Sequence, residues 1–292
     1  MVGLDLDFVR SIMPERDPEG HKGTFGTSVI VAGSPDITGA QALAAEASLR
    51  SGAGITRIYA PYGSLIASRI RLPSAVTSSF PDSAADTVRL ERSRMKDSTA
   101  YAIGPGIDPA DDRMQAMLYF LITEAPCLVI DATAIRMIAR DREFYLPLLS
   151  KRMEEGLAPA ILTPHAGELS DLTGEAVSDK EALIEGACEI PAVVVCKLGS
   201  RTVVTVPQKG AAYSLAAPNS GMAKGGSGDV LTGLITGLLA QGMSPEDAAC
   251  AGVFIHAKAG ERAAELHTER FMQPTDVIDC FKNIYEGIEN GR

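Results

Sequence analysis

One stretch of the chain constrains its fold more than any other, a glycine-rich turn that runs directly into an apolar helix. It covers residues 219–233 and reads NSGMAKGGSGDVLTG. From Val230 to Leu239, apolar residues recur at intervals of three and four, which predicts a helix with one buried face over 228–241. The glycines allow a sharp turn and close approach of backbone N–H groups to a ligand, so this helix start predicts an anion site, most often for phosphate. The predicted anion-binding residues are Gly225, Gly226, Ser227 and Gly228.

Asp229 follows this turn directly. A carboxylate beside a bound polyphosphate is repelled by it, so the position needs a chemical reason. A general base for a hydroxyl that attacks the phosphate is such a reason. The alternative is that Asp229 only caps the helix. The glycines, the serine and the long apolar helix together favour the phosphate site and the catalytic role.

Short apolar runs alternate with helical patterns along most of the chain. We expect strands at 27–33, 55–60, 101–104, 128–131, 161–163 and 193–197, a hairpin from 201–206 and 212–215, and helices at 5–13, 39–51, from Ser244 and after Pro274. Continuously apolar strands are typical of a sheet that is covered on both faces, and strand–helix alternation indicates parallel strands. The pattern predicts an α/β fold with a mostly parallel central sheet, helices on both faces, and one domain over residues 1–292.

Charge and cysteine content exclude several classes of function. The net charge is −10 and no Lys/Arg-rich run occurs, which argues against a nucleic-acid partner. No apolar run approaches the length of a membrane span, and the N-terminus lacks a secretion signal. The five cysteines are not closely paired, and the four histidines lack zinc-ligand spacing. We expect a soluble cytoplasmic protein with buried free thiols and no membrane partner.

Several predicted strands end in glycine or polar residues, and open parallel sheets bind ligands at these ends. Gly104 and Gly106 would allow a ligand close to the backbone, although a tight turn explains them as well. Asp131 ends the next strand, where its carboxylate either holds Mg²⁺ or a hydroxyl, or caps the following helix. One cleft would collect these groups.

Two further loops carry candidate binding residues. His165 and Glu168 lie three residues apart after a strand, where they can hydrogen-bond a substrate and hold a metal-bound water. The segment 197–201 offers a cation and backbone amides to a nucleotide; its alternative is a hairpin turn with a solvated lysine and arginine. His256 lies in a predicted helix among small apolar residues, and there we favour a structural role.

Five motifs, in this order, resemble those of the ADP- or ATP-dependent NAD(P)H-hydrate dehydratases, which belong to the ribokinase-like superfamily. They cover residues 26–40, 47–54, 103–106, 162–168 and 219–233. The resemblance implies a ribokinase-like fold and an enzyme that phosphorylates hydrated NADH or NADPH and then eliminates the phosphate. It implies that the hydrated cofactor binds at Ala40, Gly104, Gly106, His165 and Asp229. It implies that ADP or ATP binds at Lys197, Leu198, Gly199, Ser200, Arg201 and Gly228.

Phosphoryl transfer usually needs Mg²⁺ to neutralise the phosphates, and Glu168 is the candidate that orients the metal through water. The chain departs from the family pattern within 131–136, where Thr133 and Arg136 replace the usual Asp and Asn, and these changes bear on substrate choice. It also departs at Ala166, Leu198 and Lys224, where Pro, Gly and Thr are usual.

Two other functions stay open at this point. The first is a small-molecule kinase of the same fold, acting on a thiazole or pyrimidine alcohol. The second is a non-catalytic nucleotide-binding protein, against which the intact Asp229 argues. For the dehydratase we expect a homo-oligomer, no fused epimerase domain, and a separate NAD(P)H-hydrate epimerase as a partner in the same repair.

Overall fold

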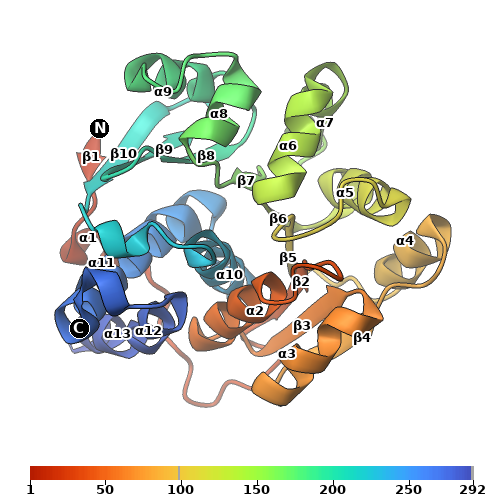
Figure 1. The fold of residues 1–292 in the computed structure, drawn as a ribbon, viewed down its shortest axis with the longest axis horizontal. Helices are drawn as coiled ribbons and strands as arrows, with labels where there is room; N and C mark the ends of the chain where they lie inside the picture. Colours follow the sequence, from red (N-terminus) through yellow and green to blue (C-terminus); the bar gives the residue numbers. More distant parts are fainter. Residues whose placement is uncertain (98, 291–292) are drawn as a thin grey trace.

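The computed structural model describes residues 1–97 and 99–290, and a ten-stranded sheet runs through them (Figure 1). The strands are β1 (Val2–Gly3), β2 (Thr27–Val31), β3 (Ile55–Ala60), β4 (Val76–Ser79), β5 (Thr99–Ile103), β6 (Cys127–Ile130), β7 (Ile161–Leu162), β8 (Val193–Lys197), β9 (Arg201–Val206) and β10 (Gly210–Ala216). Their order is β1-β10-β9-β8-β7-β6-β5-β2-β3-β4. Only β9 is antiparallel to its neighbours among these strands, so the predicted mostly parallel sheet and added hairpin are confirmed.

Helices connect most of the strands. They are α1 (Leu6–Ile12), α2 (Ala40–Arg50), α3 (Leu65–Arg71), α4 (Ala84–Arg92), α5 (Asp112–Glu124), α6 (Ala132–Arg140), α7 (Arg142–Glu154), α8 (Ala166–Thr173), α9 (Lys180–Cys188), α10 (Ser227–Ala240), α11 (Pro245–Phe271), α12 (Pro274–Asp279) and α13 (Phe281–Glu289), with short 3-10 turns η1 (Tyr62–Ser64) and η2 (Ser220–Met222). The chain from Pro274 onward forms two helices where we predicted one. A break at Cys280 lets both helices turn apolar residues, such as Ile278 and Phe281, into the same core. Within the described ranges, no helix is long and apolar enough to cross a membrane.

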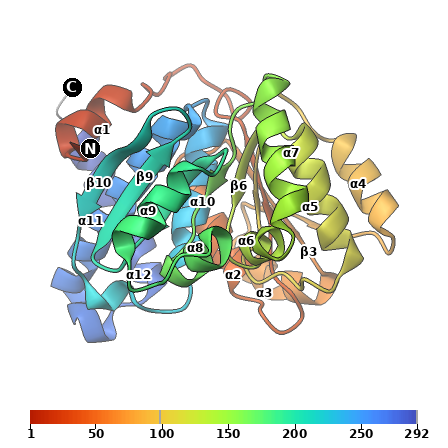
Figure 2. The ribbon, with the colours of Figure 1, turned by 90° about the horizontal axis from the view of Figure 1, so that it is seen from above.

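The sheet is covered on both faces, as Figures 1 and 2 show. Helices α1 to α3 and α10 to α13 pack on one face, and α4 to α9 pack on the other. Successive residues of β2 point to opposite sides, so Ile30 joins one core and Val29 and Val31 join the other. All three are fully buried. This two-sided burial is why the strands read as continuous apolar runs.

Helices α2 and α10 lie in unusually close contact. A Cβ atom placed on Gly233 would lie 1.9 Å from the backbone oxygen of Ala44. One placed on Gly237 would lie 1.9 Å from Ser51 Oγ and 2.8 Å from the backbone oxygen of Ser48. Glycine at both positions therefore lets the two helices approach at backbone distance, and they run in the same direction.

The five cysteines are all free. Cys196, Cys250 and Cys280 are buried, as expected, whereas Cys127 and Cys188 are only half-buried. Burial raises the pKa of the Cys196 thiol to about 12, so it stays protonated and unreactive.

The carboxyl ends of the central strands meet at one edge of the sheet. There β5 leads into Gly104, β6 into Asp131, β7 into Thr163, and β8 ends at Lys197. Helices α2, α6, α8 and α10 begin near this edge, so their positive N-terminal ends add to its attraction for anions. The edge is where the candidate site residues gather.

Candidate active site

The glycine-rich turn forms the N-terminus of α10. Gly226 is the N-cap residue and has φ of 99°, which a side chain would strain. A Cβ there would also lie 2.5 Å from Leu43 of α2. The N-cap thus has no side chain to satisfy the first N–H groups of the helix. The Ser227 N–H donates to the Lys224 carbonyl at 3.2 Å, and the next N–H groups of the turn are the ones available to an anion.

Asp229 lies in the first turn of α10, one residue after Gly228, and no side-chain cap is formed there. Asp229 is therefore not the N-cap residue of α10, and its role as a general base remains a prediction. Burial, and then the charge of Asp131, raises the pKa of Asp229 from 3.8 to about 7, although Lys197 opposes the shift. A carboxylate with a pKa near 7 suits a general base at neutral pH.

Asp131 is held by side chains from distant parts of the chain. Thr232, one turn after Asp229 on α10, donates a hydrogen bond of 2.7 Å to Asp131 Oδ2. Lys197 Nζ lies 3.6 Å from the other oxygen, Oδ1. The carboxylate forms no side-chain cap on α6, so the capping alternative is wrong. That Asp131 holds Mg²⁺ or a ligand hydroxyl remains a prediction.

Lys197 points into the site, not into solvent. Its side chain is 23% exposed, and a Cβ on Gly228 would lie 3.5 Å from Nζ. The segment that follows is a hairpin turn, as the alternative proposed, but the lysine beside it is directed at the start of α10. A cation next to free helix N–H groups completes an anion site.

His165 and Glu168 form a reciprocal cap on α8. His165 Nδ1 accepts hydrogen bonds from the N–H groups of Gly167 (3.0 Å) and Glu168 (3.1 Å), so a neutral His165 carries its proton on Nε2. Glu168 Oε2 accepts from the His165 N–H, and Oε1 lies 3.3 Å from His165 Nε2 and 3.5 Å from Arg136 Nη2. Both oxygens of Glu168 therefore have protein partners, and a contact with a metal through water remains a prediction.

A pocket of about 430 Å³ opens in front of these groups. His165, Lys197, Ser227 and Gly228 form a polar end where phosphate would be favoured. Its lining also includes Gly199, Ser200, Thr202, Leu215, Ala217, Asn219, Met222, Ala223, Lys224, Leu231, Val253, His256 and Ala257. The pocket therefore joins a phosphate-binding end to an apolar chamber.

Some predicted nucleotide-binding residues do not line this pocket. Leu198 is buried in the core, and Arg201 donates a hydrogen bond of 3.3 Å to Glu181. Gly225 is exposed and Gly226 is covered by Leu43, so both act here through the shape of the turn. Direct contact of these four residues with a nucleotide remains a prediction.

The predicted substrate residues Ala40 and Gly106 lie side by side. A Cβ on Gly106, which has φ of 65°, would lie 3.1 Å from the Ala40 Cβ. Gly104 is required for another reason, because a Cβ there would lie 1.8 Å from the backbone oxygen of Asp131. These glycines bring the loops after β2, β5 and β6 together at the edge that carries Asp229.

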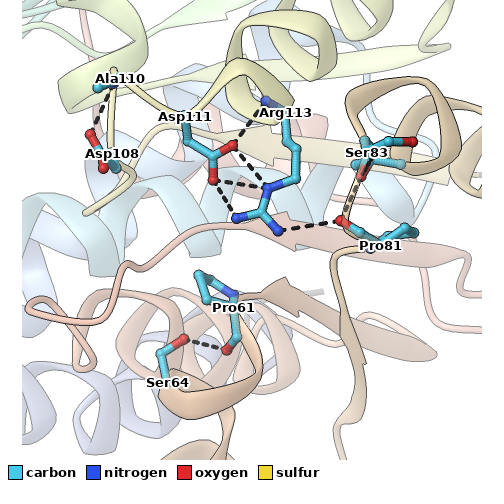
Figure 3. Close-up of polar contacts among 9 residues, drawn as sticks. Pro61, Ser64, Pro81, Ser83, Asp108, Ala110, Asp111 and Arg113 are labelled. Carbon is cyan, nitrogen blue, oxygen red and sulfur yellow. Dashed lines mark hydrogen bonds and ion pairs between the residues drawn. The ribbon is translucent and has the colours of Figure 1, made fainter.

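The rim beyond them is fixed by Arg113 at the start of α5 (Figure 3). Its guanidinium binds both oxygens of Asp111 and donates to the Pro81 carbonyl after β4 at 3.3 Å. On the neighbouring loop after β3, Ser64 donates to the Pro61 carbonyl at 2.8 Å. The loops after β4 and β5 are thus joined to each other beside the predicted substrate residues.

The sequence analysis did not predict that two residues, Thr232 and His256, belong to the site. Thr232 was treated only as part of an apolar helix, although its place three residues after Asp229 puts both on one helix face. His256 was assigned a structural role, but its ring lines the pocket. The small residues around it in the sequence are consistent with a core helix, and they gave no sign of the cavity.

The fold is ribokinase-like, and its glycine-rich helix turn lies beside the Asp229 carboxylate. A solved structure described as a ribokinase-like superfamily protein, from Enterococcus faecalis, shares the fold with a TM-score of 0.81 and 24% identity over 98% of this chain and 96% of that one. A family model described as NAD(P)H-hydrate dehydratase matches residues 28–283. The chain belongs to the NAD(P)H-hydrate dehydratase family.

Two proteins that are similar to this chain have more specific descriptions. The ADP/ATP-dependent NAD(P)H-hydrate dehydratase of Bacillus subtilis, co-crystallised with ATP and Mg²⁺, is 30% identical and superimposes with a TM-score of 0.79, covering 98% of both chains. The bifunctional NAD(P)H-hydrate repair enzyme Nnr of Moorella thermoacetica is 35% identical over 98% of this chain. The chain spans 54% of that relative's length.

Proposed function

We propose that this protein converts hydrated NADH or NADPH back to the dihydronicotinamide, with ADP or ATP as phosphoryl donor. The observation that carries the proposal is Asp229, a half-buried carboxylate with a pKa raised to about 7 at the entrance of an anion-binding helix turn. Membership of the dehydratase family supports the same assignment.

In the proposed reaction, the hydroxyl of the hydrated ring attacks the terminal phosphorus of the nucleotide. Asp229 takes the hydroxyl proton as the new phosphorus–oxygen bond forms, and the bond to the bridging oxygen breaks. The ring carbon–oxygen bond then breaks, and its electron pair leaves with phosphate. Loss of a proton from the adjacent ring carbon restores the double bond. The transferred phosphoryl group and the oxygen of the ring hydroxyl together make up the released phosphate, so no separate water molecule is consumed.

The N–H group of Gly228 and the Ser227 hydroxyl, with Lys197, would hold the phosphates during this step. Mg²⁺, when bound, neutralises phosphate charge. The described residues contain no cluster of three or more His, Cys, Asp or Glu side chains. Mg²⁺ commonly binds phosphates and water with one or two carboxylates, and besides Asp229 the candidate carboxylates at this edge are Asp131 and Glu168.

The test is incubation of the full chain with hydrated NADH, Mg²⁺ and either ADP or ATP. We expect recovery of the dihydronicotinamide absorbance and release of inorganic phosphate in equal amounts. Phosphate release without recovered absorbance would contradict the proposal. A stable phosphoester from a thiazole or pyrimidine alcohol would instead establish the kinase alternative, which rests only on the fold that both enzyme classes share. Nucleotide binding without turnover of either kind would establish the non-catalytic alternative.

We also propose a cytoplasmic location, a homo-oligomeric state, and a separate epimerase as a partner in repair. The free cysteines support the location. Exposed Ile66 and Ile70 on α3, beside the edge strand β4, support contact between copies, which sedimentation would test. The bifunctional relative, about twice as long as this chain, supports the link to a second repair activity.

A further inference from the structure

His256 on α11 has a buried nitrogen without a hydrogen-bond partner. Its Nε2 atom is shielded from solvent and, among the described residues, has no donor or acceptor within reach. Its ring lines the pocket together with Val253 and Ala257 of the same helix. A buried polar atom at a ligand pocket, unsatisfied by protein, indicates a group that the ligand satisfies.

The protonation of the ring defines what Nε2 can do. A hydrogen bond to the Ser227 backbone favours the protonated ring, so the His256 ring is the donor in that contact. Burial, followed by the nearby charge of Lys197, nevertheless lowers the pKa of His256 to about 4, so the ring is neutral at pH 7. A neutral imidazole that donates through one nitrogen has only a lone pair on the other, so Nε2 is an acceptor.

The position of His256 excludes phosphate as its ligand. The phosphates are expected at the N–H groups of α10 and at Lys197, and a phosphate at pH 7 offers lone pairs that would repel the lone pair of Nε2. The pocket continues from Ser227 past His256 to Val253 and Ala257, so the part of a nucleotide that follows the phosphates would lie against the ring. That part carries two kinds of uncharged donor, the ribose hydroxyls and the exocyclic amino group of adenine.

We propose that His256 Nε2 accepts a hydrogen bond from an uncharged donor of the bound nucleotide, a ribose hydroxyl or the adenine amino group, and thereby selects for nucleotides that carry it. The inference rests on the proposed use of ADP or ATP and adds the residue that reads the nucleoside. A nucleotide without the donor leaves Nε2 buried and unsatisfied, which is expected to weaken binding about tenfold.

The experiment measures binding by calorimetry on the full chain with Mg²⁺, in the absence of hydrated cofactor. The probes are ADP, 2′-deoxy-ADP, 3′-deoxy-ADP and inosine diphosphate, which remove one candidate donor each. We expect the wild type to bind one of the three analogues about tenfold more weakly than ADP, and the analogue concerned names the donor. Equal binding of all four would overturn the proposal without any variant.

Two substitutions then assign the effect to His256. His256→Phe removes the acceptor and keeps a ring, so it should bind ADP as weakly as the discriminated analogue and no longer distinguish the two. His256→Gln offers an amide oxygen near the position of Nε2 and should keep the discrimination. His267→Phe, on the same helix but outside the lining of the pocket, is the matched control and should behave as wild type.

Other outcomes are equally decisive. If His256→Phe weakens all four nucleotides by the same factor, or keeps the wild-type ratios, the ring does not contact the donor. If His256→Phe does not fold, loss of discrimination by His256→Gln would contradict the proposal and its retention would support it. Because no hydrated cofactor is present, this result is separate from the dehydration assay: a chain that discriminates but does not restore the dihydronicotinamide refutes only the proposed function.

Discussion

Replacing Asp229 by Asn tests the proposed base while preserving the size of the side chain. The variant keeps an oxygen at the start of α10 but cannot take a proton from the ring hydroxyl. General-base assistance is worth about 10²–10⁴-fold, so we expect kcat to fall at least about 10²-fold. ADP affinity should be retained or improved, because a negative charge near the phosphates is gone.

The pKa of Asp229 adds a second, independent expectation for the same variant. The wild-type base must lose its proton to act, so kcat/KM should rise with pH and level off above about 7. The residual activity of Asp229→Asn should lack this rise. A pH profile from 5.5 to 9, with ADP and Mg²⁺ saturating, would show the difference.

Asp229→Asn should lose activity but gain stability at high pH. The folded pKa of about 7 lies above the ordinary 3.8, so between these values the folded chain keeps a proton that the unfolded chain releases. Wild-type stability therefore falls as pH rises through this interval, on the order of a few kcal/mol, and Asn does not suffer this loss. Asp229→Asn should melt higher than wild type at pH 8 and close to it at pH 4.

Asp247 provides the matched control, because it also lies in the first turn of a helix, α11, but is only a surface cap partner of Ser244. Asp247→Asn should leave turnover unchanged and lower stability by about 0.3–1 kcal/mol. Near-normal turnover of Asp229→Asn would refute the catalytic role, and the absence of stabilisation at pH 8 would refute the argument from its buried charge.

Other substitutions test neighbouring features. Asp131→Asn removes the charge that helps to raise the pKa of Asp229, so the acid limb of kcat/KM should move below pH 7; an unmoved limb would exclude the coupling. Glu168→Gln should lower activity and raise the Mg²⁺ concentration needed, and an unchanged Mg²⁺ titration would remove Glu168 from the metal site. Gly233→Ala places a Cβ 1.9 Å from the α2 backbone and should destabilise by about 1–3 kcal/mol or more in thermal melts, whereas Gly287→Ala, with nothing within 4 Å, should not.

The central sheet was predictable because its strands are buried on both faces. Strands such as β3 and β8 have the predicted bounds, since few polar residues interrupt them. The segment between β3 and β5 was not predicted, because β4 is an edge strand with the half-exposed sequence VTSS. The order of the strands in the sheet was also not predicted, because it depends on how the chain crosses between strands and not on the local sequence pattern.

For the site, the sequence predicted the residues that lie together on one turn. It did not predict contacts between residues from different helices and strands. The glycine turn and Asp229 are contiguous, so their chemistry is visible in the sequence. The contact of Thr232 with Asp131 joins residues 101 positions apart in the sequence, and the local periodicity of apolar residues cannot indicate such a contact. For His256, a helical pattern shows which face is buried but not whether protein or an open pocket lies in front of it.

The contact of α2 with α10 has a mechanical consequence. Gly233 lies against the backbone of Ala44, and Gly237 lies against Ser51 Oγ and the Ser48 backbone oxygen, so there is little room for one helix to slide along the other. We therefore expect the helix starts at Ala40 and Ser227 to move together as one rigid body. If the proposed site is correct, the separation between a ring at one and a phosphate at the other is determined when the chain folds. Any closure over the ligands has to come from the remaining walls, the β8–β9 turn and the 219–224 loop, while the distance over which the phosphoryl group travels stays constant.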